Sequence, residues 1–259
     1  MDNASIIRLN IWQFATIYLL LFVVLIVMKK CKIGQSKLLV VASMRMTAQL
    51  VLAGFILTYI FQNPHPAFTA GYVILMTGFA IFMALRRNKQ ANLNGKFKQI
   101  IGISLAASGL LVLCFFIMVV VGVDLFNPQY TIPISGMIMG NALTGVALGV
   151  KTFSQSIKDN RLQVTTLLNM GVHPRKILAP PVSRAVETAL LPTLNNMLGM
   201  GIISLPGMMT GQMLSGTLPT VAIMYQIAII IAISAVTCLS VFCALYFGAR
   251  TLYNERLQM

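Results

Sequence analysis

Seven apolar segments, each close to the length that crosses a membrane as a helix, constrain this sequence more than any other feature. About 20 helical residues span the roughly 30 Å hydrocarbon core of a bilayer. The expected spans are residues 11–28, 38–61, 67–85, 99–123, 133–150, 184–206 and 221–248. Lipid offers the backbone no hydrogen-bond partners, so each span must satisfy its own polar groups. We therefore predict an all-α, polytopic membrane protein with about seven transmembrane helices.

The composition agrees with this fold class. Of the 259 residues, 58% are hydrophobic and only 9% are charged, whereas a soluble domain has about 25% charged residues. We expect a single transmembrane permease domain over residues 1–259, in contact with membrane lipid. The formal net charge of +14 would indicate nucleic-acid binding in a soluble protein. Here the basic residues lie in short loops, and no nucleic-acid partner is expected.

The distribution of these basic residues predicts the orientation. All but three of the 19 lysines and arginines follow the first, third or fifth span or lie in the C-terminal tail. The exceptions are Arg8, Arg45 and Arg184. Loops rich in lysine and arginine stay in the cytoplasm. The N-terminus is therefore expected outside and the C-terminus inside, in a multi-pass protein of the cytoplasmic (inner) membrane.

The longest polar insert, residues 151–176, separates the fifth and sixth spans. Residues 154–170 are predicted to form a helix that Gly171 ends, because glycine tolerates the left-handed cap. Pro174 is suited to start the next helix, since its missing N–H would have no partner there. The helix has an apolar face, with Arg161 elsewhere on the wheel; this face comprises Ile157, Val164, Leu167 and Leu168. Two interpretations stay open: the helix lies on anionic lipid, or it docks into a groove of a cytoplasmic motor domain.

Several polar residues within spans are candidates for a permeation pathway or gate. Ionisable groups in a membrane are costly and are usually functional or paired. The candidates are Arg45, Gln49, Asn141, Glu187 and Asn195. All of these except Gln49 also have a structural interpretation: Arg45 can snorkel to the surface, Glu187 can pair with Arg184 one turn away, and asparagines join helices by hydrogen bonds.

Two further features concern packing and gating. The four-residue steps Gly136/Gly140 and Gly145/Gly149 favour close helix packing. Pro206 and Gly207 interrupt helical hydrogen bonding at the outer end of the sixth span, and such breaks are tolerated where they line a cavity. We expect an outer gate there. Met208 and Met209 follow it; thioethers suit Cu(I), but methionine more often fills apolar space, and the metal ligands are unknown.

Five stretches carry a resemblance to a known family. They read SMRMTAQLVLAGFILTYIF, PISGMIMGNALTGVAL, LLNMGVHPRKI, SRAVETALLPTLNN and GIISLPGMMTGQMLSGTLPTVAIMYQI, and together they cover most of the chain. The sequence resembles the permease subunits of FetB-type ABC transporters, which include bacterial iron exporters and plant aluminium-tolerance permeases. Thr165 and Thr166 stand where that family usually has acidic residues.

The resemblance implies a homodimer that pairs with two copies of an ATP-binding subunit and exports iron or another metal. The insert helix would couple that subunit to the spans. The chain itself has no GxxxxGK[ST] loop and no catalytic constellation, so we expect a non-enzymatic transport subunit without cofactors. ATP and Mg²⁺ would be bound by the partner. The alternatives are an ABC permease for an organic solute or metal chelate, and a seven-span receptor or scaffold.

Overall fold

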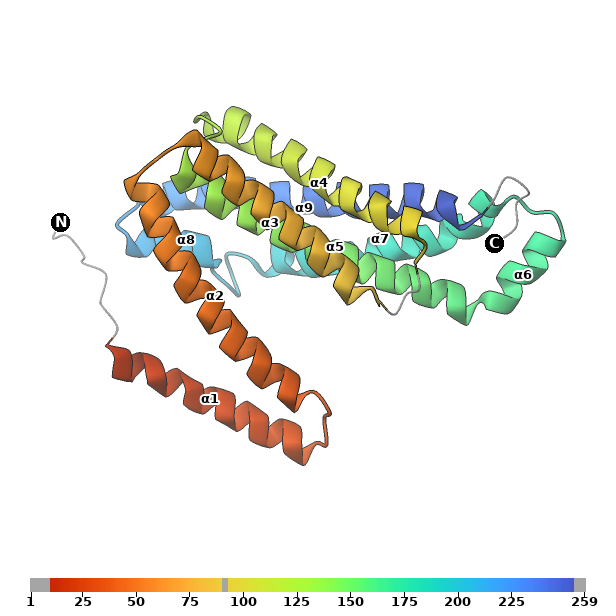
Figure 1. The fold of residues 1–259 in the computed structure, drawn as a ribbon, viewed down its shortest axis with the longest axis horizontal. Helices are drawn as coiled ribbons and strands as arrows, with labels where there is room; N and C mark the ends of the chain where they lie inside the picture. The colour runs from red at the N-terminus through yellow and green to blue at the C-terminus, as the bar shows by residue number, and fades with distance from the viewer. Residues whose placement is uncertain (1–9, 90–92, 254–259) are drawn as a thin grey trace. The chain divides into compact units, whose positions relative to one another are not determined.

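The computed structural model describes residues 10–89 and 93–253, and the regular structure in these ranges is helical apart from an isolated bridge between Met200 and Ser204. Arg8 and Arg256, which were counted for the orientation, lie outside the described residues. The chain divides into two compact units (Figure 1). The first reaches from the N-terminal side to Asn63 and includes residues 214–216; the second holds the remainder. Each unit is described separately.

The first unit is a helical hairpin of α1, Ile11–Lys30, and α2, Ser36–Gln62. The hydroxyls of Tyr18 and Thr47 form a 2.6 Å hydrogen bond between the two helices. In the part of α2 that the structure describes, Ile60 is the one buried residue. The hairpin therefore presents most of its apolar side chains outward, as a lipid-facing pair of spans does.

The second unit is a helical bundle. Its elements are α3 (Pro66–Arg87), α4 (Gly95–Phe115) with a π-helical end (Phe116–Val121), α5 (Pro128–Asp159), α6 (Arg161–Asn169), α7 (Pro174–Gly199), α8 (Gly207–Leu214) and α9 (Pro219–Ala249) with a 3₁₀ turn (Arg250–Leu252). The last residue of α8 groups with the first unit. Helix α9 packs against α4, α5 and α7, and α5 also packs against α3. Helices α5 and α9 thus form the centre of the bundle.

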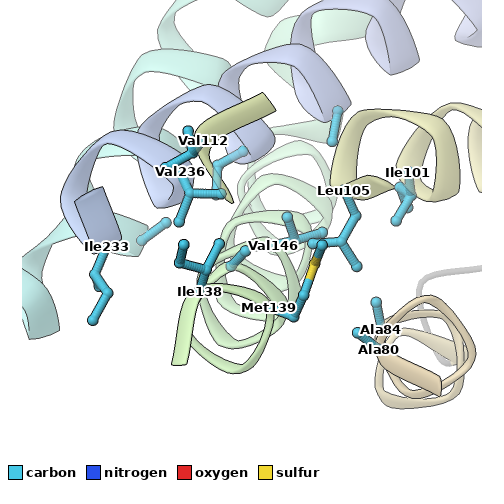
Figure 2. Close-up of a cluster of buried hydrophobic side chains, with 14 of the residues drawn as sticks. Ala80, Ala84, Ile101, Leu105, Val112, Ile138, Met139, Val146, Ile233 and Val236 are labelled. Atoms are coloured by element: carbon cyan, nitrogen blue, oxygen red, sulfur yellow. The ribbon is translucent and has the colours of Figure 1, made fainter. Parts of the chain in front are cut away.

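Branched apolar side chains fill the core of the second unit. Figure 2 shows side chains of α4, α5 and α9 meeting in a close cluster, with small residues of α3 beside it. The residues labelled there are Ala80, Ala84, Ile101, Leu105, Val112, Ile138, Met139, Val146, Ile233 and Val236. Close packing in this cluster stabilises the bundle through van der Waals contacts, because lipid tails are as apolar as these side chains.

Glycine permits the closest helix contacts, as predicted for Gly145 and Gly149. A Cβ atom on Gly145 would lie 2.5 Å from Cγ2 of Thr237, and one on Gly149 would lie 2.7 Å from Cγ1 of Val241. The same Gly149 position faces Ala189 of α7 at 3.5 Å. These two glycines therefore let α5 approach α9 and α7, whereas a Cβ atom on the exposed Gly140 would meet nothing within 4 Å.

One end of the bundle gathers the starts of α4 and α7 with the ends of α5 and α9. The rings of Phe97 and Phe153 lie 6.3 Å apart. The Nδ2 of Asn94 donates to the carbonyl of Thr251 at 3.4 Å. The described basic residues of the second unit that follow α3 and α5, together with Arg250 after α9, therefore lie at this common end, which we call the basic end.

Six helices in the described residues are long and apolar enough to cross a membrane: α1, α2, α3, α4 with its π-helical end, α5 and α9. The predicted sixth span is the exception. It corresponds to α7, which starts at Pro174 rather than at residue 184 and has 26 residues, enough for a span, but is too polar to qualify. The fifth span also differs from its expected bounds, because α5 begins at Pro128 and accommodates Pro133 within the helix.

Candidate permeation face and coupling segment

The coupling segment, residues 151–176, does not contain the single helix that was predicted for residues 154–170. Helix α5 continues to Asp159, and the separate helix α6 begins only at Arg161. No glycine or proline lies between Gly149 and Gly171 to stop α5 earlier. At Asn160 the side-chain Nδ2 donates to the carbonyl of Ser156 at 2.8 Å. Asparagine competes with the helical backbone in this way, so the chain bends there.

The predicted turn between α6 and α7 is confirmed. Gly171 has φ +79°, in the left-handed region. Its N–H donates to the carbonyl of Leu168 at 2.9 Å, and the N–H of Val172 donates to that of Leu167 at 3.0 Å. This pair of bonds is the Schellman arrangement that closes a helix. Pro174 then occupies the first turn of α7, as expected.

His173 caps the start of α7, and sequence reasoning did not assign it this role. Its Nδ1 accepts a hydrogen bond from the backbone N–H of Arg175 at 3.2 Å. The Nε of Arg175 donates to the hydroxyl of Tyr253 at 3.4 Å, and this bond raises the pKa of the guanidinium. The start of α7 is therefore tied to the segment that follows α9.

The apolar face of the coupling segment points largely into the protein. Val164 is 8% exposed, and Ile157, Leu167 and Leu168 are half-buried. Arg161 is exposed, as expected. This face therefore offers little apolar surface to a partner.

Two apolar side chains of α6 that were not predicted as contact residues are exposed instead. Leu162 is 84% exposed and Met170, at the C-terminal cap, is 73% exposed. Both are apolar residues in a polar insert, and this was the sequence signal that could have identified them as contact residues. The hydroxyls of Thr165 and Thr166 bond to the carbonyls of Arg161 and Leu162, at 2.9 Å each. Helix α6 thus has satisfied hydroxyls beside two exposed apolar anchors.

Polar side chains are exposed along the middle of α5 and α7. They comprise Asn141 and Thr144 of α5 and Glu187 and Asn195 of α7, and we call this set the permeation face. Helices α5 and α7 are antiparallel neighbours that touch where Gly149 faces Ala189. From Gly149, Asn141 lies eight residues away, which is about 12 Å along a helix. Asn195 lies at a similar level on α7, beyond Ala189.

One interpretation expected the amide of Asn141 to join two helices, but its hydrogen bond lies within α5. Its Nδ2 donates to the carbonyl of Met137 in its own helix at 2.8 Å. Likewise, the hydroxyl of Thr144 donates to the carbonyl of Gly140 at 3.0 Å. Both side chains keep further bonding capacity toward the exposed side.

Arg184 and Glu187 lie close together in sequence on α7, and both are exposed. Among the described residues, the structure records no ion pair between them. The hydroxyl of Thr188 bonds instead to the carbonyl of Arg184 at 2.8 Å. Glu187 also lines a groove between α7 and α9, so it borders both the permeation face and that groove.

Arg45 and Gln49, on α2 in the first unit, are exposed. They are one helical turn apart and face outward from the hairpin in the same general direction. Both stay candidates for the pathway.

The predicted break near Pro206 is present but begins earlier. Helix α7 ends at Gly199, a turn with Gly201 at φ +87° follows, and α8 starts at Gly207. The carbonyl of Pro206 accepts hydrogen bonds from both the N–H and the hydroxyl of Thr210, at 3.0 Å each. The carbonyl of Pro206 is therefore hydrogen-bonded at the point where α8 begins.

The methionines after the break contribute to packing. Met209 is buried, and Met208 packs against the core cluster. The structure brings together no group of three or more His, Cys, Asp or Glu side chains suited to a metal in the residues it describes. A role for these methionines as an outer gate stays a prediction.

Comparison with known proteins identifies the family. Residues 11–253 match the uncharacterised protein family UPF0014. The chain belongs to this family. A relative from Escherichia coli, the probable iron export permease protein FetB, is 29% identical over 95% of this chain and 93% of its own length.

Two further relatives come from a bacterium and a plant. The membrane protein YjkA of Bacillus subtilis is 28% identical over 91% of this chain and 94% of its own length. The protein ALUMINUM SENSITIVE 3 of Arabidopsis thaliana is 34% identical over 70% of this chain and 64% of its own length. No solved structure matches the chain significantly. The resemblance to FetB-type permeases is confirmed, and the chain is a multi-pass membrane protein.

Proposed function

We propose that this chain is the permease subunit of an ABC transporter, driven by a separate ATP-binding subunit. The support is membership of UPF0014, similarity to a protein named as a probable iron export permease, and long apolar helices. In this proposal, residues 1–259 act as one transmembrane domain. Helix α7 serves as the sixth of seven spans, and the basic end faces the cytoplasm.

The observation that carries the proposal is the permeation face. Asn141, Thr144, Glu187 and Asn195 are exposed in the middle of a membrane bundle, where contact with lipid would be costly. A second copy of the chain that presents the same face would enclose these groups in a polar passage. The functional unit is thus a homodimer, with the passage between copies.

The coupling segment supplies the second element of the mechanism. Leu162 and Met170 are exposed apolar residues at the basic end, and they suit helix-in-groove docking to a partner. The ATP-binding subunit binds ATP and Mg²⁺. Closure of this subunit moves α6. Helix α6 is joined to α5 at Asn160 and to α7 by the turn at Gly171. Relative movement of α5 and α7 then opens the passage to one side.

Iron or another metal ion, exported from the cell, is the proposed substrate. This proposal comes from the printed name of the E. coli relative. A metal chelate or organic solute is the alternative substrate. Deleting and overexpressing the chain should change cell metal content in opposite directions, with metal accumulating on deletion; unchanged metal content would refute metal export.

Co-purification provides the direct test of the ABC assignment. The detergent-solubilised chain should retain an ATP-binding subunit in stoichiometric amount, and Leu162→Asp should release it. The receptor or scaffold alternative predicts no such partner. Arg86→Gln is the matched control, because Arg86 is exposed at the end of α3 and lies outside the coupling segment.

A further inference from the structure

A groove of about 600 Å³ runs between α7 and α9 in the second unit. Its α7 wall repeats an apolar residue every four positions, from Leu178 through Val182, Val186 and Leu190 to Leu194. Successive members of the row lie one above the next on the helix surface, and the row winds gradually around α7 over about 24 Å. The α7 wall is therefore mostly apolar, with Ser183 and Glu187 beside the row, over more than half of the roughly 30 Å hydrocarbon core.

The groove is cationic at one end only. Arg175, at the start of α7, and Arg250, just after α9, both line it there. The Nη2 of Arg250 donates to the hydroxyl of Tyr246 at 2.7 Å, and its guanidinium carbon lies 4.5 Å from the centre of that ring. Among the described side-chain atoms, Nε of Arg250 is buried and has no hydrogen-bond partner. The guanidinium is thus held in place against Tyr246 at the lining of the groove.

Aromatic rings form the opposite wall beside the arginines. Phe242 and Tyr246 of α9 stack at 5.3 Å with an interplanar angle of 13°. The hydroxyl of Tyr253 accepts from Nε of Arg175 at 3.4 Å. Tyrosine at a membrane surface places an apolar ring toward the lipid tails and a polar tip toward the headgroups. This end of the groove therefore has the chemistry of the bilayer interface.

We propose that the α7–α9 groove binds one anionic phospholipid, whose phosphate contacts Arg175 and Arg250 and whose acyl chain lies along the apolar row of α7. Guanidinium groups match phosphate oxygens with paired donors. The charge order fits one lipid orientation, with the headgroup at the basic end of the bundle. Placing that headgroup in the inner leaflet rests on the orientation proposed above; headgroup recognition does not.

Glu187 is compatible with this occupant because of its position. It lies twelve residues from Arg175 on α7, about 18 Å along the helix, beside the acyl part of the groove. It is exposed and can turn toward the permeation face. The carboxylate is therefore too far away to neutralise the arginines, and the lipid phosphate remains their partner.

Lipid retention tests the proposal with the full-length protein. The chain is reconstituted into nanodiscs of equal parts phosphatidylglycerol and phosphatidylcholine with identical acyl chains, then released into mild detergent and analysed by native mass spectrometry. The wild type should retain phosphatidylglycerol over phosphatidylcholine by about tenfold. The double variant Arg175→Gln/Arg250→Gln should retain the two lipids about equally. An unchanged preference in the double variant would overturn the proposal.

Two further variants distinguish specific headgroup binding from nonspecific attraction by charge, and test acyl-chain binding separately. Arg86→Gln/Arg87→Gln removes two exposed arginines from the end of α3, outside the groove, and should keep the preference; an equal loss here would refute the site. Val186→Trp fills the apolar row with both arginines intact and should lower total lipid retention in protein that elutes as folded. Retention unchanged by this substitution would contradict acyl-chain binding.

A second copy of the chain is the competing occupant of the groove. The variant Val182→Cys reports on it: an efficient disulfide between copies in membranes would overturn the lipid assignment. None of these measurements uses transport. A wild-type chain that exports no metal but keeps its lipid preference would refute the proposed function alone. Metal export by a wild-type chain without lipid preference would refute the lipid site alone.

Discussion

Replacing Gly248 by alanine should destabilise the bundle, although alanine is the better helix former. Gly248 lies in α9 against the ring of Phe97, and a Cβ atom there would lie 2.7, 2.8 and 2.9 Å from three ring carbons. Favourable carbon contacts are about 3.5–4.0 Å. Phe97 is 0% exposed and also packs on Phe153, so the ring has no free space to enter.

The expected magnitude follows from two opposing terms. Overpacking a close-packed core costs about 1–3 kcal/mol, and a rigid ring with three short contacts places Gly248→Ala at the upper end. Alanine gains about 1 kcal/mol over glycine in a helix interior. The net loss is therefore about 2 kcal/mol. Gly109→Ala should cost less, because its Cβ would meet the terminal Sδ and Cε atoms of Met139, which have more rotamers available.

Equilibrium unfolding of the purified chain in detergent, monitored by far-ultraviolet circular dichroism, measures these differences in the free energy of unfolding. Gly78→Ala is the control, since that position in α3 has no neighbour within 4 Å, and it should gain up to about 1 kcal/mol. Gly248→Ala should cost less stability in the Phe97→Leu background than in the wild type, and the difference is the coupling energy of a double-mutant cycle. Equal stability of Gly248→Ala and Gly78→Ala would refute the packing argument.

Three further predictions concern partner binding, the stability of the turn at Gly171, and metal export. Leu162→Asp should weaken binding of the ATP-binding subunit at least tenfold, because it places a charge at an apolar anchor; co-purification measures this. Leu167→Ala should weaken the binding less, because Leu167 is half-buried. Gly171→Ala should cost about 1–2 kcal/mol, because non-glycine residues are strained at φ +79°; the unfolding midpoint checks this, and Gly171→Asn should be milder. Asn141→Leu should lower metal export in cells without loss of folded protein, and normal export would remove Asn141 from the pathway.

The sequence predicted the membrane helices well because lipid imposes a simple rule. Length and apolarity identified six spans to within a few residues at most ends, and Pro174 and Gly171 marked their turn through backbone geometry that is local to each residue. The start of α5 was missed, since Pro133 suggested a helix start although Pro128 supplies it. A proline is compatible with both positions, and its local chemistry cannot choose between them.

The coupling segment was less predictable because its faces depend on tertiary contacts. The periodicity of Ile157, Val164, Leu167 and Leu168 correctly indicated one apolar face. Whether that face meets a partner or the bundle depends on where α6 folds, and in the structure it meets the bundle. The groove between α7 and α9 was also missed, because its two arginines are 75 residues apart in sequence.

The polarity of α7 is best understood together with the permeation face. A helix with Arg184, Glu187 and Asn195 exposed would be costly in lipid, and for this reason hydropathy excludes α7 from the spans. Its other side is buried, since Ala185 and Ala189 pack against α5. A helix that is fixed to a membrane bundle on one side and polar on the other requires water or protein on its polar side. A second copy of the chain, with a passage between the two, supplies both, so the low hydropathy of α7 supports the proposed homodimer.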